Sequence, residues 1–203
     1  MNILNYNKTF FLKSIAKISD IKIEHGIEIA FIGYSNSGKS SAINSLTNQK
    51  KLARFSKTPG RTQLINFFQV TSNFRIVDLP GYGYAKAPLS IKMNWQNMIY
   101  SYLKTNRSLK GLVLLMDIRY PLKNLDQDII NIALIYKIPI LLLLTKCDKF
   151  TINNQNIQFR KVHKKLEKFS NQLDIQLFSS LKKIGIEKLK SKLNYWYEKY
   201  YLI

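Results

Sequence analysis

The chain has 203 residues and a formal net charge of +20, from 32 Lys and Arg residues against 12 Asp and Glu residues. With 46% hydrophobic residues, this length predicts one domain, residues 1–203, with a substantial core and a short N-terminal extension at residues 1–26. The longest apolar stretches fall short of the roughly 18 residues that a membrane-spanning helix needs, so no membrane insertion is expected. One cysteine and two histidines exclude an internal disulfide and a zinc cluster. Because residues 1–6 show no signal-peptide pattern, we expect a cytoplasmic, monomeric protein.

The first predicted strand, residues 27–33, leads through a glycine-rich loop into a predicted helix at residues 39–49. The loop, residues 33–40, has the pattern G-x-x-x-x-G-K-S. A strand that ends in such a loop and opens a helix directs several backbone N–H groups and the positive helix N-terminus at one point, which suits a triphosphate. We expect Lys39 to reach the β and γ phosphates and the Ser40 hydroxyl to ligate Mg²⁺.

The next two predicted strands, residues 65–71 and 74–80, are separated by only two residues. This spacing is too short for a crossover, so the two strands form an antiparallel hairpin. Asp78 lies near the end of the second strand, where ligands of open parallel sheets bind, and is expected to hold the Mg²⁺ through water. Gly81 lacks a side chain, so its N–H can approach the γ-phosphate and sense its presence. The loops at residues 50–64 and 81–92 are expected to switch with the nucleotide.

Helices are then predicted near residues 91–105 and 123–136, and strands near residues 111–117 and 139–145. The last of these strands ends in the run Thr145-Lys146-Cys147-Asp148. The Asp148 carboxylate can accept the N1–H and the 2-amino group of guanine together, whereas adenine would leave it unpaired. This argues for GTP rather than ATP. The Lys146 stem can cover one face of the base, and Cys147 fills the variable position of the turn.

The final predicted elements are a helix at residues 155–170, a strand at residues 174–179 and a helix at residues 185–201. The turn Phe178-Ser179-Ser180 follows the strand and can offer backbone N–H groups to guanine O6. Apolar residues of the last helix recur every three or four positions, which predicts a stripe that packs into the core: Ile186, Leu189, Leu193, Trp196 and Tyr200. The alternation of strands and helices predicts a three-layer α/β fold, with a six-stranded, mostly parallel sheet, one antiparallel edge strand and helices on both faces.

Three longer runs are more particular than these motifs. They are S-K-T-P-G-R-T-Q at residues 56–63, D-L-P-G-Y-G-Y-A at residues 78–85 and F-S-S-L-K-K at residues 178–183. With them the chain resembles the EngB (YihA/YsxC) family of bacterial P-loop GTPases, within the TrmE-Era-EngA-EngB-Septin-like superfamily, from about residue 28 to the C-terminal helix. The resemblance implies a P-loop GTPase fold, bound GTP or GDP with Mg²⁺, and a role as a molecular switch in assembly of the large (50S) ribosomal subunit. It also implies a need for the protein in normal cell division and septation.

The resemblance extends the expected site to the first switch loop, where Thr62 would complete the Mg²⁺ shell. The expected metal ligands are therefore Ser40, Thr62 and Asp78, and the residues expected to act in catalysis are Asn36, Lys39, Thr62 and Gly81. Two loop positions depart from the family pattern: Tyr34 replaces an arginine, and Ser37 replaces a small apolar residue. The expected nucleotide-binding residues are Gly33, Tyr34, Ser35, Asn36, Ser37, Gly38, Lys39, Ser40, Ser41, Gly60, Arg61, Thr62, Gln63, Leu64, Asp78, Leu79, Pro80, Gly81, Thr145, Lys146, Cys147, Asp148, Phe178, Ser179 and Ser180.

Hydrolysis of GTP would proceed without the water-orienting glutamine that many GTPases carry after the glycine that matches Gly81. Here Tyr82 follows Gly81, and a phenol with a pKa of about 10 is a poor general base at neutral pH. A low intrinsic rate is therefore expected, with stimulation by a partner or by K⁺. We hypothesise that Asn36 lets a potassium ion stand in for an arginine finger. Arg61 and Arg119 are alternative charge donors, although an exposed or phosphate-contacting role outside the chemistry is the more common use of such arginines.

The charge of +20 has two interpretations that the sequence leaves open. It fits a polyanionic partner, which the resemblance identifies as the large ribosomal subunit or its rRNA precursor. It also fits compositional drift, because the chain is rich in the Ile, Asn, Lys and Tyr residues that an AT-rich genome encodes. Three functions are considered: a GTPase switch on the ribosomal subunit, a GTP-regulated binding module of the division machinery in which hydrolysis is dispensable, and an ATP-dependent small-molecule kinase, which Asp148 disfavours.

Overall fold

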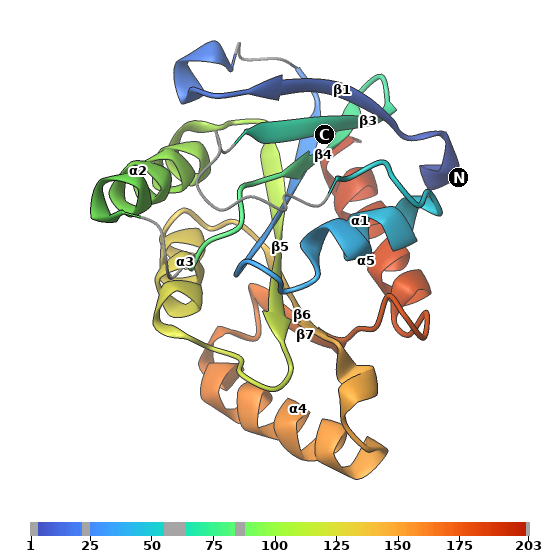
Figure 1. The fold of residues 1–203 in the computed structure, drawn as a ribbon. Helices are drawn as coiled ribbons and strands as arrows, with labels where there is room; N and C mark the ends of the chain where they lie inside the picture. The colour runs from blue at the N-terminus through green and yellow to red at the C-terminus, as the bar shows by residue number, and fades with distance from the viewer. Residues whose placement is uncertain (1–3, 22–24, 55–63, 84–87, 202–203) are drawn as a thin grey trace.

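The computed structural model describes residues 4–21, 25–54, 64–83 and 88–201. A seven-stranded sheet with the order β1-β3-β4-β2-β5-β6-β7 forms the middle layer, with helices on both faces (Figure 1). The three-layer α/β fold expected from the sequence is thus confirmed. The strands are β1 (Phe10–Ile15), β2 (Ile27–Gly33), β3 (Ile65–Thr71), β4 (Phe74–Asp78), β5 (Leu109–Asp117), β6 (Ile140–Thr145) and β7 (Leu173–Leu177). The helices are α1 (Lys39–Thr47), α2 (Leu89–Thr105), α3 (Asn124–Ile135), α4 (Ile152–Leu166) and α5 (Ile186–Tyr201), and short 3₁₀ turns are η1 (Tyr6–Lys8), η2 (Ile18–Asp20), η3 (Cys147–Lys149) and η4 (Glu167–Phe169).

The sheet has one strand more than the six expected. Strand β1 lies in the segment expected to be an N-terminal extension, and it pairs antiparallel with β3, with Phe11 opposite Phe68 and Ile15 opposite Ile65. Only Ile15 of this strand is buried. The strand was not predicted because its sequence, F-F-L-K-S-I, lacks the alternation of apolar and polar side chains that marks a half-buried strand. Strand β3 runs antiparallel to β4, as expected, but it also pairs antiparallel with β1, so it occupies an inner position and β1 forms the edge.

Some element boundaries also differ from expectation. Helix α4 begins at Ile152, three residues early, because the Thr151 side chain caps it by accepting the N–H of Asn154. Helix α2 begins at Leu89, directly after Pro88, within a stretch expected to be loop. Of the two expected switch loops, residues 55–63 and 84–87 lie outside the described residues.

The core lies on both faces of the central strands. Strands β2 and β6 are buried along their whole length, as is usual where helices cover both faces of a parallel sheet. Apolar residues of α2, α3 and α4 pack on one face, and those of α1 and α5 pack on the other. Within the expected apolar stripe of α5, Leu189, Leu193 and Trp196 are fully buried, and Ile186 and Tyr200 pack at its margin. The prediction of a core stripe is confirmed.

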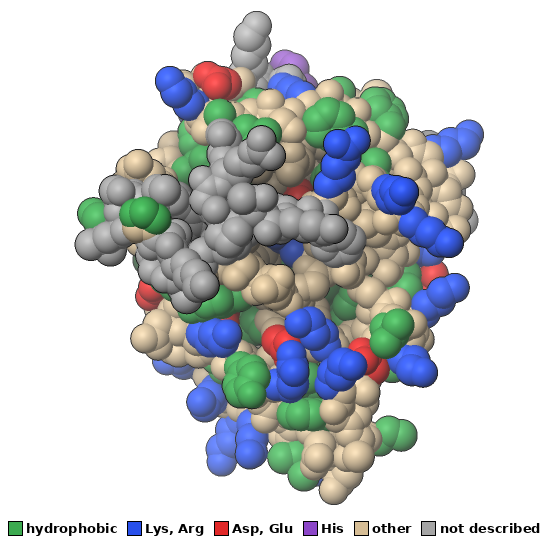
Figure 2. All heavy atoms as spheres, in the orientation of Figure 1, with side chains coloured by type: hydrophobic (Ala, Val, Ile, Leu, Met, Phe, Trp, Pro, Cys, Tyr) green, Lys and Arg blue, Asp and Glu red, His purple; other side chains and the backbone are tan. Residues whose placement is uncertain are grey.

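The parallel strands all end at one edge of the sheet, and polar residues stand at these ends. They are Asp78 on β4, Asp117 on β5 and Thr145 on β6, with Gly33 at the end of β2. Ligands of open α/β sheets bind outside such strand ends. The visible face carries many more Lys and Arg than Asp and Glu side chains (Figure 2). Within the described part of the chain, no helix has the length and apolar character needed to cross a membrane.

Candidate functional site

The glycine-rich loop joins β2 to α1 and forms the floor of the site. Gly38 caps α1 with a left-handed backbone at φ 96°, a conformation that glycine adopts without strain, and Asn36 is also left-handed at φ 64°. The amides of Gly38, Lys39 and Ser40 donate to no group among the described residues. Together with the positive end of α1, these N–H groups form a site that an anion would satisfy.

Lys39 and Asp78 form an ion pair at the centre of the edge. The Lys39 ammonium contacts Asp78 Oδ1, and the two side chains are 12% and 6% exposed. The amide of Asn66 lies 3.5 Å from Asp78 Oδ2. In this arrangement each charge neutralises the other, so a phosphate would compete with Asp78 for Lys39, and a cation would compete with Lys39 for Asp78.

The same edge offers hard oxygen ligands of the kind that Mg²⁺ prefers. The Asp78 carboxylate and the Ser40 hydroxyl come from β4 and the start of α1, and the hydroxyl lies 3.4 Å from the carbonyl of Arg54. No group of three or more His, Cys, Asp or Glu residues suited to a metal occurs in the described residues. The oxygen donors therefore fit an ion that completes its shell with phosphate oxygens and water, which is how Mg²⁺ binds at nucleotide sites.

Gly81 and Tyr82 lie against the loop. A Cβ atom on Gly81 would lie 3.5 Å from the Gly33 carbonyl oxygen and from Ser35 Cα. The N–H of Tyr82 donates to the Gly33 carbonyl at 3.2 Å, and the Tyr82 carbonyl accepts the N–H of Ser35 at 2.7 Å. The backbone after β4 is thus paired directly with the loop, in a position where it would respond to a change in the loop's ligand.

The Tyr82 side chain is buried beside the loop. Its ring is 1% exposed, and its hydroxyl donates to Asp126 Oδ1 on α3. Burial, followed by the charge of Asp126, raises the pKa of Tyr82 well above its ordinary value. The phenol is therefore neutral and occupied, and it is not placed to orient a water molecule at the loop.

Tyr34, the departure from the family pattern, packs on Tyr82. The two ring centroids are 4.6 Å apart at an angle of 61°, and the Lys123 ammonium lies 4.3 Å from the Tyr34 centroid. A Cβ on Gly83 would overlap the Tyr34 ring. The tyrosine therefore joins the loop to the chain after β4 and to the start of α3, through aromatic and cation–π contacts.

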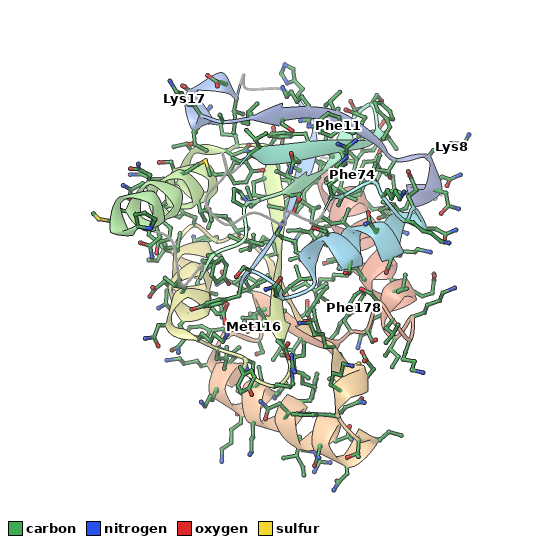
Figure 3. All side chains as sticks on the ribbon, viewed as in Figure 1. Lys8, Phe11, Lys17, Phe74, Met116 and Phe178 are labelled. Carbon is green, nitrogen blue, oxygen red and sulfur yellow. The ribbon has the colours of Figure 1, made fainter. Side chains whose placement is uncertain are left out.

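Thr145 and Lys146, at the end of β6, bind the backbone of the phosphate loop. The Thr145 hydroxyl lies 2.6 Å from the Ser37 carbonyl and 3.1 Å from the Met116 carbonyl, and Figure 3 shows Met116 near this end of β5. The Lys146 ammonium donates to the Asn36 carbonyl at 2.6 Å and lies 3.0 Å from Asp117 Oδ2. These bonds fix the position of the loop relative to β5 and β6.

Asp117 is a site residue that the sequence analysis did not identify. Arg119 donates to both of its oxygens, at 2.9 and 2.7 Å. Partial burial opposes ionisation, but the hydrogen bonds from Arg119 and Lys146 outweigh it and hold the pKa of Asp117 well below its usual range. Its position at the end of a buried strand, like that of Asp78, was the available signal. Because Arg119 is bound to Asp117, its use as a catalytic charge would require this pair to break.

Asp148 meets the turn after β7. The Ser179 hydroxyl donates to Asp148 Oδ1 and accepts the N–H of Lys182 at 3.1 Å. The amides of Phe178 (Figure 3) and Ser179 donate to the carbonyls of Leu144 and Ile184. Of the three amides expected to meet guanine O6, that of Ser180 is therefore the one without a partner in the described residues.

Of the other expected residues, Ser41 is half-buried and Pro80 is buried, and the rest fall into three groups. Cys147 and Leu79 are fully buried, so each can offer a ligand only its backbone. Leu64 is 37% exposed and lines a cleft formed with β1, β3 and the segment that follows α1. The expected residues Gly60, Arg61, Thr62 and Gln63 lie outside the described residues.

Comparison with known proteins identifies the family of this chain. Residues 28–146 match a protein family that is described as a 50S ribosome-binding GTPase. The chain is 87% identical over 200 residues to a probable GTP-binding protein EngB of Buchnera aphidicola subsp. Schizaphis graminum, covering 98% of this chain and 100% of the relative. It is 53% identical over 194 residues to the corresponding protein of Haemophilus influenzae, covering 96% of this chain and 95% of the relative.

A crystal structure of a probable GTP-binding protein EngB superposes with a TM-score of 0.71 at 23% identity, over 85% of this chain and 99% of the other. At this identity the superposition shows a shared fold. The sequence matches extend nearly end to end in both directions, so they cover the phosphate loop, the strand ends and the turn after β7 together. The chain belongs to the EngB family of P-loop GTPases.

Proposed function

We propose that this protein is a cytoplasmic GTP-operated switch that binds the assembling large ribosomal subunit in its GTP form and leaves after slow, Mg²⁺-dependent hydrolysis. The observation that carries the proposal is the meeting, at one edge of the sheet, of a phosphate-binding loop with Lys39, an acid at Asp78 and a base-reading acid at Asp148. Each group alone has other uses. At their common edge they supply partners for the phosphates, the metal and the base of a guanine nucleotide.

The base-reading end favours guanine. Asp148 Oδ1 accepts the Ser179 hydroxyl, which holds the carboxylate beside this turn, and the Ser180 amide, which has no partner in the described part of the chain, lies in the same turn. A carboxylate that accepts two adjacent N–H groups, next to an amide that donates to an oxygen, complements the guanine edge. Adenine would leave the carboxylate facing an acceptor, and a buried polar group without its partner typically costs about 1–3 kcal/mol.

The phosphate end accounts for hydrolysis. Lys39 and the amides of the loop would neutralise the β and γ phosphates, while Ser40, Asp78 and Thr62 would hold Mg²⁺. When bound, Mg²⁺ withdraws charge from the phosphate oxygens. Gly81, whose backbone lies against the loop, would sense the γ-phosphate. Hydrolysis would be slow because Tyr82, in the position of the usual glutamine, is bonded to Asp126 within the core.

A potassium ion would supply the missing positive charge, with Asn36 as the residue that admits it. The Asn36 side chain is exposed at the turn of the loop, and its carbonyl is held by Lys146. Turnover should be faster in KCl than in NaCl at equal ionic strength, and Asn36→Ala should reduce this difference. Phosphate release at saturating GTP measures both. Equal rates in the two salts would remove potassium from the mechanism.

The partner is proposed from the family description and from charge. The matching family is described as ribosome-binding, and a net charge of +20 attracts RNA at long range. Co-sedimentation with purified large-subunit precursors tests the proposal: the protein should pellet with a non-hydrolysable GTP analogue and stay in the supernatant with GDP. Effects on septation would then follow from ribosome supply. Binding to division proteins, with no nucleotide-dependent binding to the subunit, would favour a GTP-regulated module of the division machinery instead.

A further inference from the structure

A cleft lies apart from the nucleotide edge, beside the segment that follows α1. It has a volume of about 840 Å³ and lies between β1, β3 and the segment 48–54 that follows α1. Its lining includes Phe11, Lys50, Lys51, Arg54, Leu64 and Asn66, and Phe11 is labelled in Figure 3. We call it the Phe11 groove. Its volume falls within the range of about 300–1,000 Å³ that is common for ligand clefts, and no residue of the phosphate loop lines it.

The polar lining of the Phe11 groove is cationic. Lys50, Lys51 and Arg54 are exposed, and no acidic residue lines the groove. The sequence around it is also free of acids, because residues 1–19 and 29–77 contain no Asp or Glu. Nothing in these segments therefore neutralises the three cations. Charge complementarity selects an anionic partner.

The apolar lining includes an aromatic ring that the fold does not bury. Phe11 is 52% exposed, although its ring meets that of Phe68 edge to face at 6.2 Å. Leu64 beside it is 37% exposed. An exposed ring next to three cations is the arrangement by which proteins bind single-stranded nucleic acid, since a base stacks on the ring while the backbone phosphates meet the cations.

We propose that the Phe11 groove binds a single-stranded segment of ribosomal RNA, with a base on Phe11 and phosphates on Lys50, Lys51 and Arg54. This inference rests on the proposed function, because it names the surface by which the switch reaches its partner. The RNA segment is taken to be unpaired because the π face of Phe11 can meet a base only where that base is free of its duplex.

Hydrogen bonds of its lining residues connect the Phe11 groove to the nucleotide edge. Asn66 accepts the Ser14 hydroxyl at 2.6 Å, and its amide approaches Asp78, the partner of Lys39. The Arg54 carbonyl lies 3.4 Å from the Ser40 hydroxyl. A phosphate or cation that separates Lys39 from Asp78 would therefore change the surroundings of Asn66. One that binds Ser40 would change those of Arg54. By linkage, RNA in the groove would alter nucleotide affinity by the same factor.

The test uses a fluorescently labelled single-stranded oligouridine, with binding measured by anisotropy in the presence of a GTP analogue. Phe11→Ala should weaken binding by about 10-fold, which is within the range for losing one stacked base. Phe10→Ala is the matched control, because Phe10 directly precedes Phe11 in β1, is 54% exposed and does not line the groove. Phe11→Leu keeps the apolar contact with Phe68 and removes the π face, so it should also bind weakly. Equal affinities for the Phe10 and Phe11 variants would overturn the proposal.

A second comparison tests the cations. The triple variant Lys50→Ser, Lys51→Ser and Arg54→Ser should lower the salt dependence of log K by about 2, from roughly 0.7 per phosphate contact on a single strand. The matched control replaces three lysines of α4, Lys161, Lys164 and Lys165, by serine. Both variants lose the same charge, so an equal effect of the two on the salt slope would contradict the groove as the binding site.

Pelleting with large subunits separates this inference from the proposed function. If the unaltered protein pellets with the GTP analogue and the groove variants do not, the groove is the docking surface. If all of them pellet equally, the groove proposal fails and the proposed function stands. If the unaltered protein does not pellet in either nucleotide state, the proposed function fails. Loss of pelleting by groove variants, without oligouridine binding by the unaltered protein, would assign the groove to a ribosomal protein and overturn the RNA proposal.

Discussion

At the scale of single residues, Asp126 is a carboxyl group placed among the side chains that support the phosphate loop. It is 1% exposed, accepts the Tyr82 hydroxyl with one oxygen and accepts the N–H of Lys123 with the other at 2.9 Å. Burial raises its pKa to about 6, although the hydrogen bonds from Tyr82 and Lys123 act in the opposite direction. The folded protein therefore holds this proton more tightly than the unfolded chain does.

This raised pKa predicts how stability depends on pH. Asp126 contributes stability that is fully present below its unfolded pKa of about 4 and is lost as pH rises through about 6, a loss of up to about 2–3 kcal/mol. The free energy of unfolding in urea, measured from pH 4 to pH 7, should therefore fall in the normal protein relative to Asp126→Asn, which does not ionise. Parallel pH curves for the two proteins would contradict the protonation of Asp126.

The same residues show what sequence can and cannot predict at this scale. Asp78 and Asp148 could be singled out because each stands within four residues of the end of a buried strand, where motif and position agree. Tyr34, Tyr82 and Asp126 could not be joined, because their contacts link residues 48 and 44 positions apart and depend on how α3 packs. Asp117 also stands at the end of a buried strand, but it belongs to no sequence motif that would have singled it out.

At the scale of elements, α5 packs closely on β5 where Gly111 has no side chain. A Cβ at Gly111 would lie 2.5 Å from Cε3 of the buried Trp196 ring. Packing at this distance requires that position 111 be glycine, because the ring is fully buried and cannot move into solvent. The close contact brings the C-terminal helix onto the sheet opposite α2.

Gly111→Ala should therefore destabilise the fold by about 1–3 kcal/mol, through overpacking against Trp196. Trp196→Phe removes Cε3 and Cζ3, the two atoms that would overlap most, so the double variant should lose less stability than the sum of the two single variants. Urea unfolding of the four proteins measures this coupling. Strictly additive losses would show that the overlap at Trp196 is not the cause.

The sequence predicts six of the seven strands and misses β1. Strands β2, β5 and β6 are apolar runs bounded by turns, so their own residues identify them. Strand β1 exposes Phe10, Phe11 and Leu12 and owes its conformation to pairing with β3, which is a long-range interaction that periodicity does not report. Of the exposed residues of β1, Phe11 and Ser14 line the Phe11 groove.

At the scale of the whole molecule, the buried charges are paired within the protein, whereas the excess of cations lies on the surface. Glu28 and Arg75, on neighbouring strands at the end of the sheet away from the loop, form a buried pair at 3.1 Å, and Glu28 also accepts the Tyr102 hydroxyl at 2.9 Å. These buried charges are satisfied internally. Most other cations lie on the surface, where their excess gives the +20 charge its long-range effect.

The sequence could predict the global arrangement because motif order and strand order coincide. The loop, Asp78 and Asp148 follow β2, β4 and β6, so the topology of a parallel sheet brings them to one edge. It could not predict which cations form a surface, since the groove cations lie beside Phe11, about 40 residues away in the chain. The fold alone places them together.

The central claim is that the guanine nucleotide at this edge controls docking on the large ribosomal subunit. Its most direct test is large-subunit pelleting of the normal protein and of Asp148→Asn, each with non-hydrolysable GTP and xanthosine triphosphate analogues. The substitution exchanges one acceptor for a donor, which suits the xanthine oxygen in place of the guanine amino group. The normal protein should pellet only with the GTP analogue, and Asp148→Asn only with the xanthosine analogue. Pelleting of both proteins with the same nucleotide, or with none, would contradict the account.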